Sequence, residues 1–138
     1  MPSPRPYTTV VVDDSHELRS LWRLMLEYDD RFAVVAEAAD GRSGVAAAEL
    51  HQPDLVLLDI AMPVMDGLQA LRLIRSEAPL STVVMHSSFS EDSIQASLAR
   101  RMGAHGFIRN GQTRQALLAK LETILRRTGG AVSATAQC

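Results

Sequence analysis

Three aspartates stand directly after two apolar runs of the sequence. Asp13 and Asp14 follow the run VVV, and Asp59 follows the run LVLL. If the two runs are parallel strands, their carboxyl ends lie together, at the edge where such sheets bind ligands. Carboxylates held this close repel one another, and a hard divalent cation with oxygen ligands offsets the repulsion. Any one of these residues alone would more often be a helix cap, but the three together predict an open Mg²⁺ site.

Polar residues also follow two later apolar runs. HSS (86–88) comes after VVM, and RN (109–110) comes after the pair FI. Both stretches are expected at the same edge of the sheet as the aspartates. Because successive strand residues face opposite sides, His86 is expected to point away from the side that Ser87 faces. No functional role is therefore assigned to His86.

The elements that must position these residues are visible as two alternating patterns. Short, mostly continuous apolar runs are typical of strands that are buried on both faces of a sheet. Amphipathic stretches with helical spacing separate them. This alternation predicts an α/β fold, a single domain with a doubly wound, five-stranded parallel sheet. The expected strands are Thr9–Val12, Ala33–Ala36, Leu55–Leu58, Val83–Met85 and Phe107–Ile108.

Five helices are expected between and after these strands. The first carries an apolar stripe that includes Trp22, and the last carries a stripe of leucines that ends near Arg127. Asp40 and Asp66 precede two of the intervening helices and are N-cap candidates. The three intervening helices are expected over 41–50, 66–76 and 91–102.

Composition excludes several classes of protein. The chain has 138 residues and a net charge of −2, so no global field favours nucleic acid or an anionic membrane. A single cysteine, Cys138, rules out a disulfide within the chain, and no apolar run approaches the ~20 residues of a membrane span. We therefore expect a cytoplasmic protein with an N-terminal tail (1–7), one domain (8–127) and a flexible tail or linker remnant (128–138).

Four segments resemble, in order and spacing, the receiver domain of two-component response regulators. They are VVVDDS, DLVLLDIAMPVMDG, VVMHSS and GAHGFI, and the resemblance covers about residues 8–127. In detail the chain is most similar to receivers that precede helix-turn-helix DNA-binding domains. The resemblance implies the flavodoxin-like receiver fold. It also implies a function, the acceptance of a phosphoryl group, with Mg²⁺, from a histidine kinase or phosphotransfer protein.

The resemblance also implies roles for individual residues. Asp59 would be the phosphoacceptor and a metal ligand, Asp14 a direct Mg²⁺ ligand, and Asp13 a ligand acting mostly through water. The backbone carbonyl of Ala61 would complete the protein's share of the coordination. Ser87 would be the switch hydroxyl and Phe107 the aromatic residue that changes rotamer. Ser88 would keep the phosphoryl pocket open, and Pro63 and Gly67 match the loop after the phosphoacceptor strand.

One position departs from the family. The lysine that normally ends the fifth strand is replaced by Asn110, which has no charge to pair with a phosphoryl oxygen. Arg109 is a candidate substitute, but it shares a face with Phe107 and would need a β-bulge to reach the site. Gly111 stands where many receivers have proline, and a trans peptide bond is expected there.

Two functional interpretations remain open on the sequence alone. The first is a phosphoacceptor receiver whose switching is weakened by Asn110, and the second is a pseudo-receiver that binds proteins without phosphorylation. Neither is an enzyme: a flavodoxin loop would not carry Asp13 and Asp14, and a haloacid dehalogenase would need aspartate in place of Ala61. A homodimer or an output partner is expected to use the surface of the fourth helix, fifth strand and fifth helix.

Overall fold

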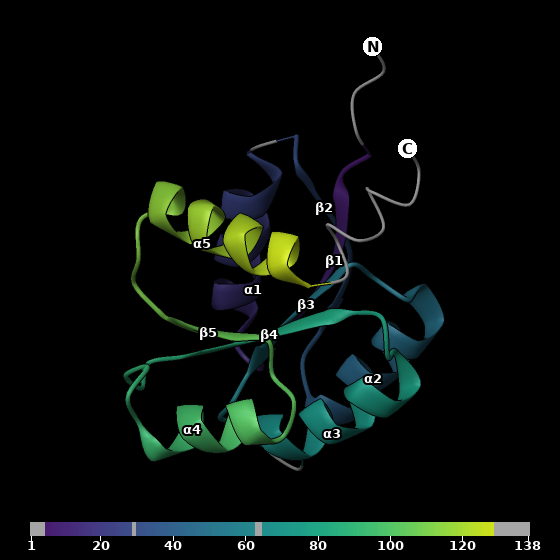
Figure 1. Cartoon of the computed structure of the whole chain (residues 1–138). Coiled ribbons are helices and arrows are strands. Elements are labelled where there is room, and N and C mark those ends of the chain that lie inside the picture. The colour runs from purple at the N-terminus through teal and green to yellow at the C-terminus, as the bar shows by residue number, and fades with distance from the viewer. Residues whose placement is uncertain (1–4, 29, 63–64, 129–138) are drawn as a thin grey trace.

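A parallel β-sheet forms the centre of the computed structural model, which describes residues 5–28, 30–62 and 65–128 (Figure 1). The sheet has five strands in the order β2-β1-β3-β4-β5, and every pairing is parallel. The order reverses at β1, so the crevice of the sheet lies between the carboxyl ends of β1 and β3. The strands are β1 (Tyr7–Val12), β2 (Phe32–Ala38), β3 (Leu55–Asp59), β4 (Thr82–Ser87) and β5 (Gly106–Arg109).

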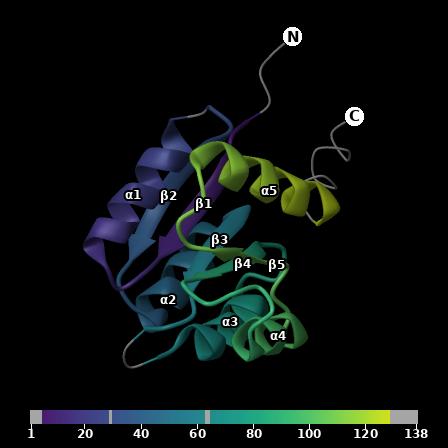
Figure 2. The same cartoon turned by 90° about the vertical axis from the view of Figure 1, so that its left-hand side faces the viewer.

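Helices cover both faces of this sheet, as the sequence predicted (Figures 1 and 2). Two of the described helices contribute to the core on one face and three to the core on the other, so the structure has three layers. The expected doubly wound α/β domain is therefore confirmed. The first pair is α1 (His16–Glu27) and α5 (Arg114–Arg127), and the second group is α2 (Gly41–His51), α3 (Gly67–Glu77) and α4 (Ile94–Arg101).

The hydrophobic core divides between the two faces of the sheet. On the α1–α5 face, Val11, Leu57 and Ile108 pack with Trp22 and Leu121. On the other face, the neighbouring strand residues pack with α2, α3 and α4; this cluster includes Val12, Leu58, Met85, Phe107 and Ile74. Because successive residues alternate between the two faces, the position of a residue at a strand end decides which face of the sheet its side chain lies on.

Side-chain caps fix where the helices begin. Asp40 accepts a hydrogen bond from the Ser43 backbone N–H (2.8 Å), and Asp66 forms a capping box with Gln69, which confirms both predicted N-caps. The fourth helix is shorter than the expected 91–102. Ser93 caps it through the backbone N–H of Ala96 (3.1 Å), so the preceding residues form a turn instead of a first helical turn.

The ends of the described chain are tied to the domain. Arg5 donates two hydrogen bonds to the Asp54 carboxylate (2.6 and 2.9 Å) just before β1 begins at Tyr7. Thr128 closes α5, and the expected tail beyond it lies outside the described residues, as does the start of the N-terminal tail. In the part of the chain that the structure describes, no helix is both long and apolar enough to cross a membrane.

Candidate functional site

The three predicted aspartates meet at the carboxyl ends of β1 and β3. One carboxylate oxygen from each of Asp13, Asp14 and Asp59 lies within 4.8 Å of the other two. The parallel pairing of Val12 with Leu58 brings the strand ends to the same level, which is why residues far apart in sequence converge. Asp13 and Asp59 are buried, whereas Asp14 is exposed and leaves the cluster open to solvent.

This arrangement makes ionisation of the buried carboxyl groups unfavourable. Burial and the negative charge of Asp13 raise the pKa of Asp59 to about 7, despite a hydrogen bond from the Ala61 backbone N–H (3.2 Å). Burial also raises the pKa of Asp13, although the Ser15 N–H (2.8 Å) donates to its Oδ1. Two buried, acceptor-only groups with raised pKa values form a donor set that fits a hard divalent cation.

The chain after β3 packs tightly beneath Asp59. The Gly67 N–H donates to the carbonyl of Ile60 (2.8 Å), and a Cβ at Gly67 would lie 2.1 Å from the carbonyl oxygen of Asp59. Only glycine permits this approach, so the start of α3 sets the position of the Asp59 backbone. Pro63, which was also expected in this loop, lies outside the described residues.

Ser87 and Phe107 lie on neighbouring strands, Ser87 at the end of β4 and Phe107 within β5. Ser87 is buried as the last residue of β4, and its Oγ accepts a hydrogen bond from the Phe89 backbone N–H (3.1 Å). The ring of Phe107 is 3% exposed and belongs to the core cluster on the α2–α4 face. Ser88, the next residue, is exposed. The structure thus describes Phe107 turned inward and paired with Met85, whereas Ser87 pairs with Arg109, two residues further along β5.

The fifth strand presents Arg109 and Asn110 on opposite sides. The register between β4 and β5 is regular up to the pair Ser87–Arg109, and the Asn110 N–H continues it by donating to the Ser87 carbonyl (2.7 Å). No bulge therefore turns Arg109, which is exposed, toward the face that Asn110 shares with Ile108. The described peptide bonds are all trans, including those at Gly111, whose φ of +93° is of a kind favoured by glycine.

His86 lies in the site although sequence reasoning gave it no role. Its Nε2 is 3.8 Å from Asp13 Oδ2, and its ring centroid is 4.8 Å from that of Trp22. The prediction considered only the face opposite Ser87. That face is also the face of Asp59, because Asp59 is paired with His86 across the sheet. Burial lowers the pKa of His86 to about 4, so the imidazole is neutral near pH 7.

These features together define a class. A doubly wound sheet that brings three aspartates together at its switch point, with a serine ending the next strand, is a two-component receiver domain. The chain belongs to the response regulator receiver domain family, whose model matches residues 9–122.

Curated and solved relatives agree with this assignment. A protein-glutamate methylesterase/protein-glutamine glutaminase of Nitratidesulfovibrio vulgaris is 42% identical over 121 residues, which are 86% of this chain and 33% of the relative. The response regulator domain of Thermotoga maritima CheB is 31% identical with a TM-score of 0.80, covering 91% of this chain and 97% of that one. The NarL receiver of Mycobacterium tuberculosis is 30% identical with a TM-score of 0.81, covering 89% and 98%.

These relatives correct one expectation from the sequence. The prediction that the protein is not an enzyme is contradicted by curated relatives that are named as methylesterases and glutaminases. The chain spans about a third or less of their length, and the matching part is the receiver domain. Residue chemistry within the receiver could not have revealed this, because the enzyme names belong to much longer proteins.

Proposed function

We propose that this chain is a phosphoacceptor receiver that takes a phosphoryl group on Asp59 from a histidine kinase or phosphotransfer protein in the cytoplasm. The receiver comprises residues 8–127 together with Tyr7, the first residue of β1, with the preceding residues as a tail and residues 128–138 as a tail or linker. The observation that carries the proposal is the cluster of three carboxylates that includes the buried Asp59. Asp59 is the nucleophile because it ends the central strand β3, with its backbone fixed by Gly67.

The chemistry follows from these residue types. An Asp59 carboxylate oxygen attacks the phosphorus in line, an acyl phosphate bond forms, and the donor leaves with the electron pair of the broken bond. Asp13, Asp14, Asp59 and the backbone carbonyl of Ala61 would hold Mg²⁺. The bound ion supplies positive charge that offsets the negative charge shared by Asp59 and the phosphoryl group.

Switching is proposed to run through Ser87 and Phe107. The Ser87 hydroxyl, which now accepts from Phe89, has its own proton free to donate to a phosphoryl oxygen, while the small side chain of Ser88 leaves the pocket open. Movement of Ser87 would open space for Phe107 to change rotamer and alter the surface.

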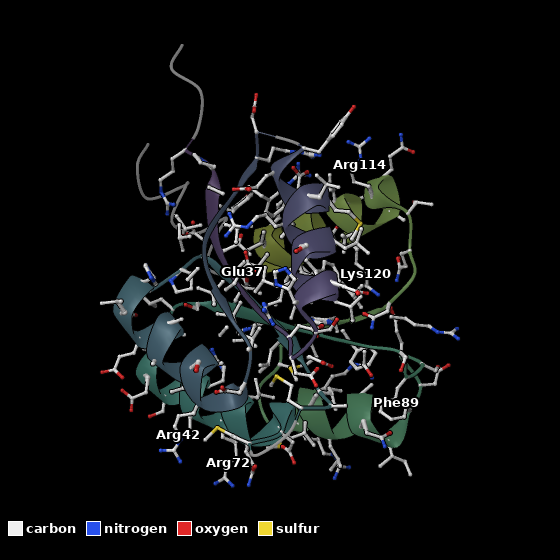
Figure 3. The ribbon with its side chains drawn as sticks, turned by 180° about the vertical axis from the view of Figure 1, so that it is seen from behind. Glu37, Arg42, Arg72, Phe89, Arg114 and Lys120 are labelled. Atoms are coloured by element: carbon white, nitrogen blue, oxygen red, sulfur yellow. The ribbon has the colours of Figure 1, made fainter. Side chains whose placement is uncertain are left out.

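The altered surface is proposed to serve a homodimer or an output partner through α4, β5 and α5. Phe89, Ile94 and Leu98 are exposed apolar residues in and before α4. An ion pair between Lys120 and Glu91 links α5 to the segment before α4. Figure 3 shows Lys120 and Phe89 on the same side of the molecule. A change in the segment between β4 and α4 after phosphorylation would therefore alter the surface that the partner contacts.

Asn110 favours a second candidate function. Without a cationic partner the phosphorylated state is less stabilised, since hydrogen bonds to charged groups are worth ~1.5–3 kcal/mol. Arg109 could replace the lysine only if the end of β5 rearranged, because its side chain leaves on the other face. We therefore propose weakened switching, with a phosphorylation-independent interaction module as the alternative.

Phosphorylation with a small phosphodonor and Mg²⁺ tests the proposal. Intact-mass measurement is expected to show the addition of one phosphoryl group to the wild-type chain and none to Asp59→Ala. Asp54→Ala is the matched control, because Asp54 precedes the other end of β3 and pairs with Arg5. The control is expected to gain the same mass as wild type.

Two outcomes contradict the proposal. A mass gain that persists in Asp59→Ala would place the phosphoryl group elsewhere. A wild-type chain that gains no mass, yet binds a partner protein as well as Asp59→Ala does, would favour the interaction module.

A further inference from the structure

Four buried polar side-chain atoms lack a hydrogen-bond partner among the residues with described positions. They are Asp13 Oδ2, both ring nitrogens of His86, and Asn110 Oδ1. All four belong to three residues at the ends of β1, β4 and β5. A buried polar atom without a hydrogen-bond partner lowers the stability of the folded state. Four such atoms in one place therefore indicate a local function.

Geometry brings the three residues into a row on one face of the sheet. His86 is paired across the sheet with Asp59 on one side and with Ile108 on the other, so it lies between the acidic cluster and β5. Its Nε2 is 3.8 Å from Asp13 Oδ2, and its ring interacts with the Val12 backbone and with the Asn110 side chain. The indole of Trp22, on α1, contacts the ring at a tilt of 52°.

We propose that His86 is a positioning residue that holds Asp13 for the metal and is itself held by Asn110. In this arrangement Nε2–H donates to Asp13 Oδ2, and Nδ1 accepts from the Asn110 amide NH₂. Asp13 Oδ1 already accepts from the Ser15 N–H, so both oxygens of this carboxylate become fixed. The inference rests on the proposed function, because it concerns the same metal-dependent site.

The donors and acceptors of the three residues are complementary. An ionised carboxylate only accepts, a neutral imidazole has one donor and one acceptor, and an amide NH₂ donates. Turning the Asn110 amide about its χ2 bond exchanges its oxygen and nitrogen, which presents the NH₂ group to Nδ1. A movement of roughly 1 Å brings Nε2 to hydrogen-bond distance from Asp13. Three of the four atoms then have hydrogen-bond partners, and the Asn110 oxygen moves to the position that its amide nitrogen now occupies.

The arrangement changes the meaning of the residue at the lysine position. Asn110 shares a face with Ile108 and reaches inward to His86. Its contribution is therefore made through His86 and Asp13, and a direct contact with a phosphoryl oxygen is not required. Hydrogen bonds that orient a metal ligand in this way typically change metal affinity by ~10–100-fold.

Calorimetric titration with Mg²⁺ tests the role of His86. His86→Phe keeps an aromatic ring against Trp22 but removes both nitrogens, and its Mg²⁺ dissociation constant is expected to rise about tenfold. His86→Gln restores a donor and an acceptor and is expected to recover most of the affinity. Asn110→Ala is expected to weaken binding in wild type and to have no further effect in His86→Phe, as coupled residues do.

Equal Mg²⁺ affinity in wild type and His86→Phe would overturn the inference, as would a Gln variant no better than Phe. A wild-type chain that neither binds Mg²⁺ nor gains a phosphoryl group would instead contradict the proposed function. If His86→Phe does not fold, nitrogen NMR of the wild-type imidazole decides the matter. The Nε2–H tautomer and a shift of its resonance on adding Mg²⁺ are expected, and the Nδ1–H tautomer would exclude the arrangement.

Discussion

Asp59→Asn is expected to be more stable than the wild-type chain in metal-free solution at pH 8. Burial and the neighbouring Asp13 raise the pKa of Asp59 from 3.8 to about 7, so an ionised Asp59 destabilises the folded state. Each pKa unit corresponds to 1.36 kcal/mol, which gives an expected gain of about 2–4 kcal/mol in the free energy of unfolding. Asparagine keeps the shape and can still accept the Ala61 N–H, so the change removes mainly the charge.

The pH dependence has a definite sign. Because the folded-state pKa of Asp59 lies above its unfolded value, the folded chain binds the proton more tightly between pH 3.8 and about 7. The stability from this group is complete below pH 3.8 and is lost as the pH rises toward 7. In urea unfolding from pH 4 to 8, the free energy of unfolding of wild type should therefore fall relative to that of Asp59→Asn. The difference between the two should become smaller when Mg²⁺ is added.

Asp54→Asn provides the control for this measurement. Burial opposes ionisation of Asp54 too, but hydrogen bonds from Arg5 and Thr8 outweigh it and lower its pKa. Asp54→Asn is therefore expected to lower the stability of the chain above pH 4, whereas Asp59→Asn is expected to raise it. If both variants lose stability at pH 8, the repulsion attributed to the acidic cluster is wrong.

At saturating Mg²⁺, where any change in metal affinity no longer affects the rate, Asn110→Lys is expected to accelerate phosphorylation of Asp59 by a small phosphodonor about tenfold. Asn110 lies on the Ile108 face, where a lysine would place its charge toward the acidic cluster. A charge-assisted hydrogen bond exceeds a neutral one by an amount close to the 1.4 kcal/mol that corresponds to a factor of ten. The time course of the mass gain measures the rate, and its decay after donor removal measures the lifetime of the acyl phosphate.

Arg109→Lys is the matched control for that substitution. Its side chain is exposed on the opposite side of β5, and its effect on the rate is expected to stay within about twofold. If Asn110→Lys leaves the rate and lifetime unchanged while Arg109→Ala lowers them, Arg109 already supplies the missing charge and the proposed weakening is wrong.

The sequence predicted the features that depend on strand order and strand ends. Continuous apolar runs and helical spacing were sufficient for the doubly wound fold, and three aspartates after two runs were sufficient for the acidic cluster. The helix caps at Asp40 and Asp66 were predictable because a capping side chain acts within three residues.

Features that depend on pairing between strands were not predictable in the same way. The position of His86 beside Asp13 requires the register Asp59–His86 and the placement of Trp22 on α1. The start of α4 depends on two serine hydroxyls that accept hydrogen bonds from nearby backbone N–H groups, Ser90 from Asp92 and Ser93 from Ala96. Apolar spacing does not describe such bonds.

The tilted contact between the rings of Trp22 and His86 has a practical consequence. Trp22 is the only tryptophan of the chain, and it contacts a ring that lies 3.8 Å from the acidic cluster. Indole emission responds to the orientation and polarity of its immediate neighbours. The unlabelled protein should therefore report events at Asp59 by a change in its intrinsic fluorescence, and Asp59→Ala should remove the response to phosphodonor while keeping the response to unfolding. Trp22 is thus a natural fluorescent probe, separated from the carboxylates by the single side chain of His86.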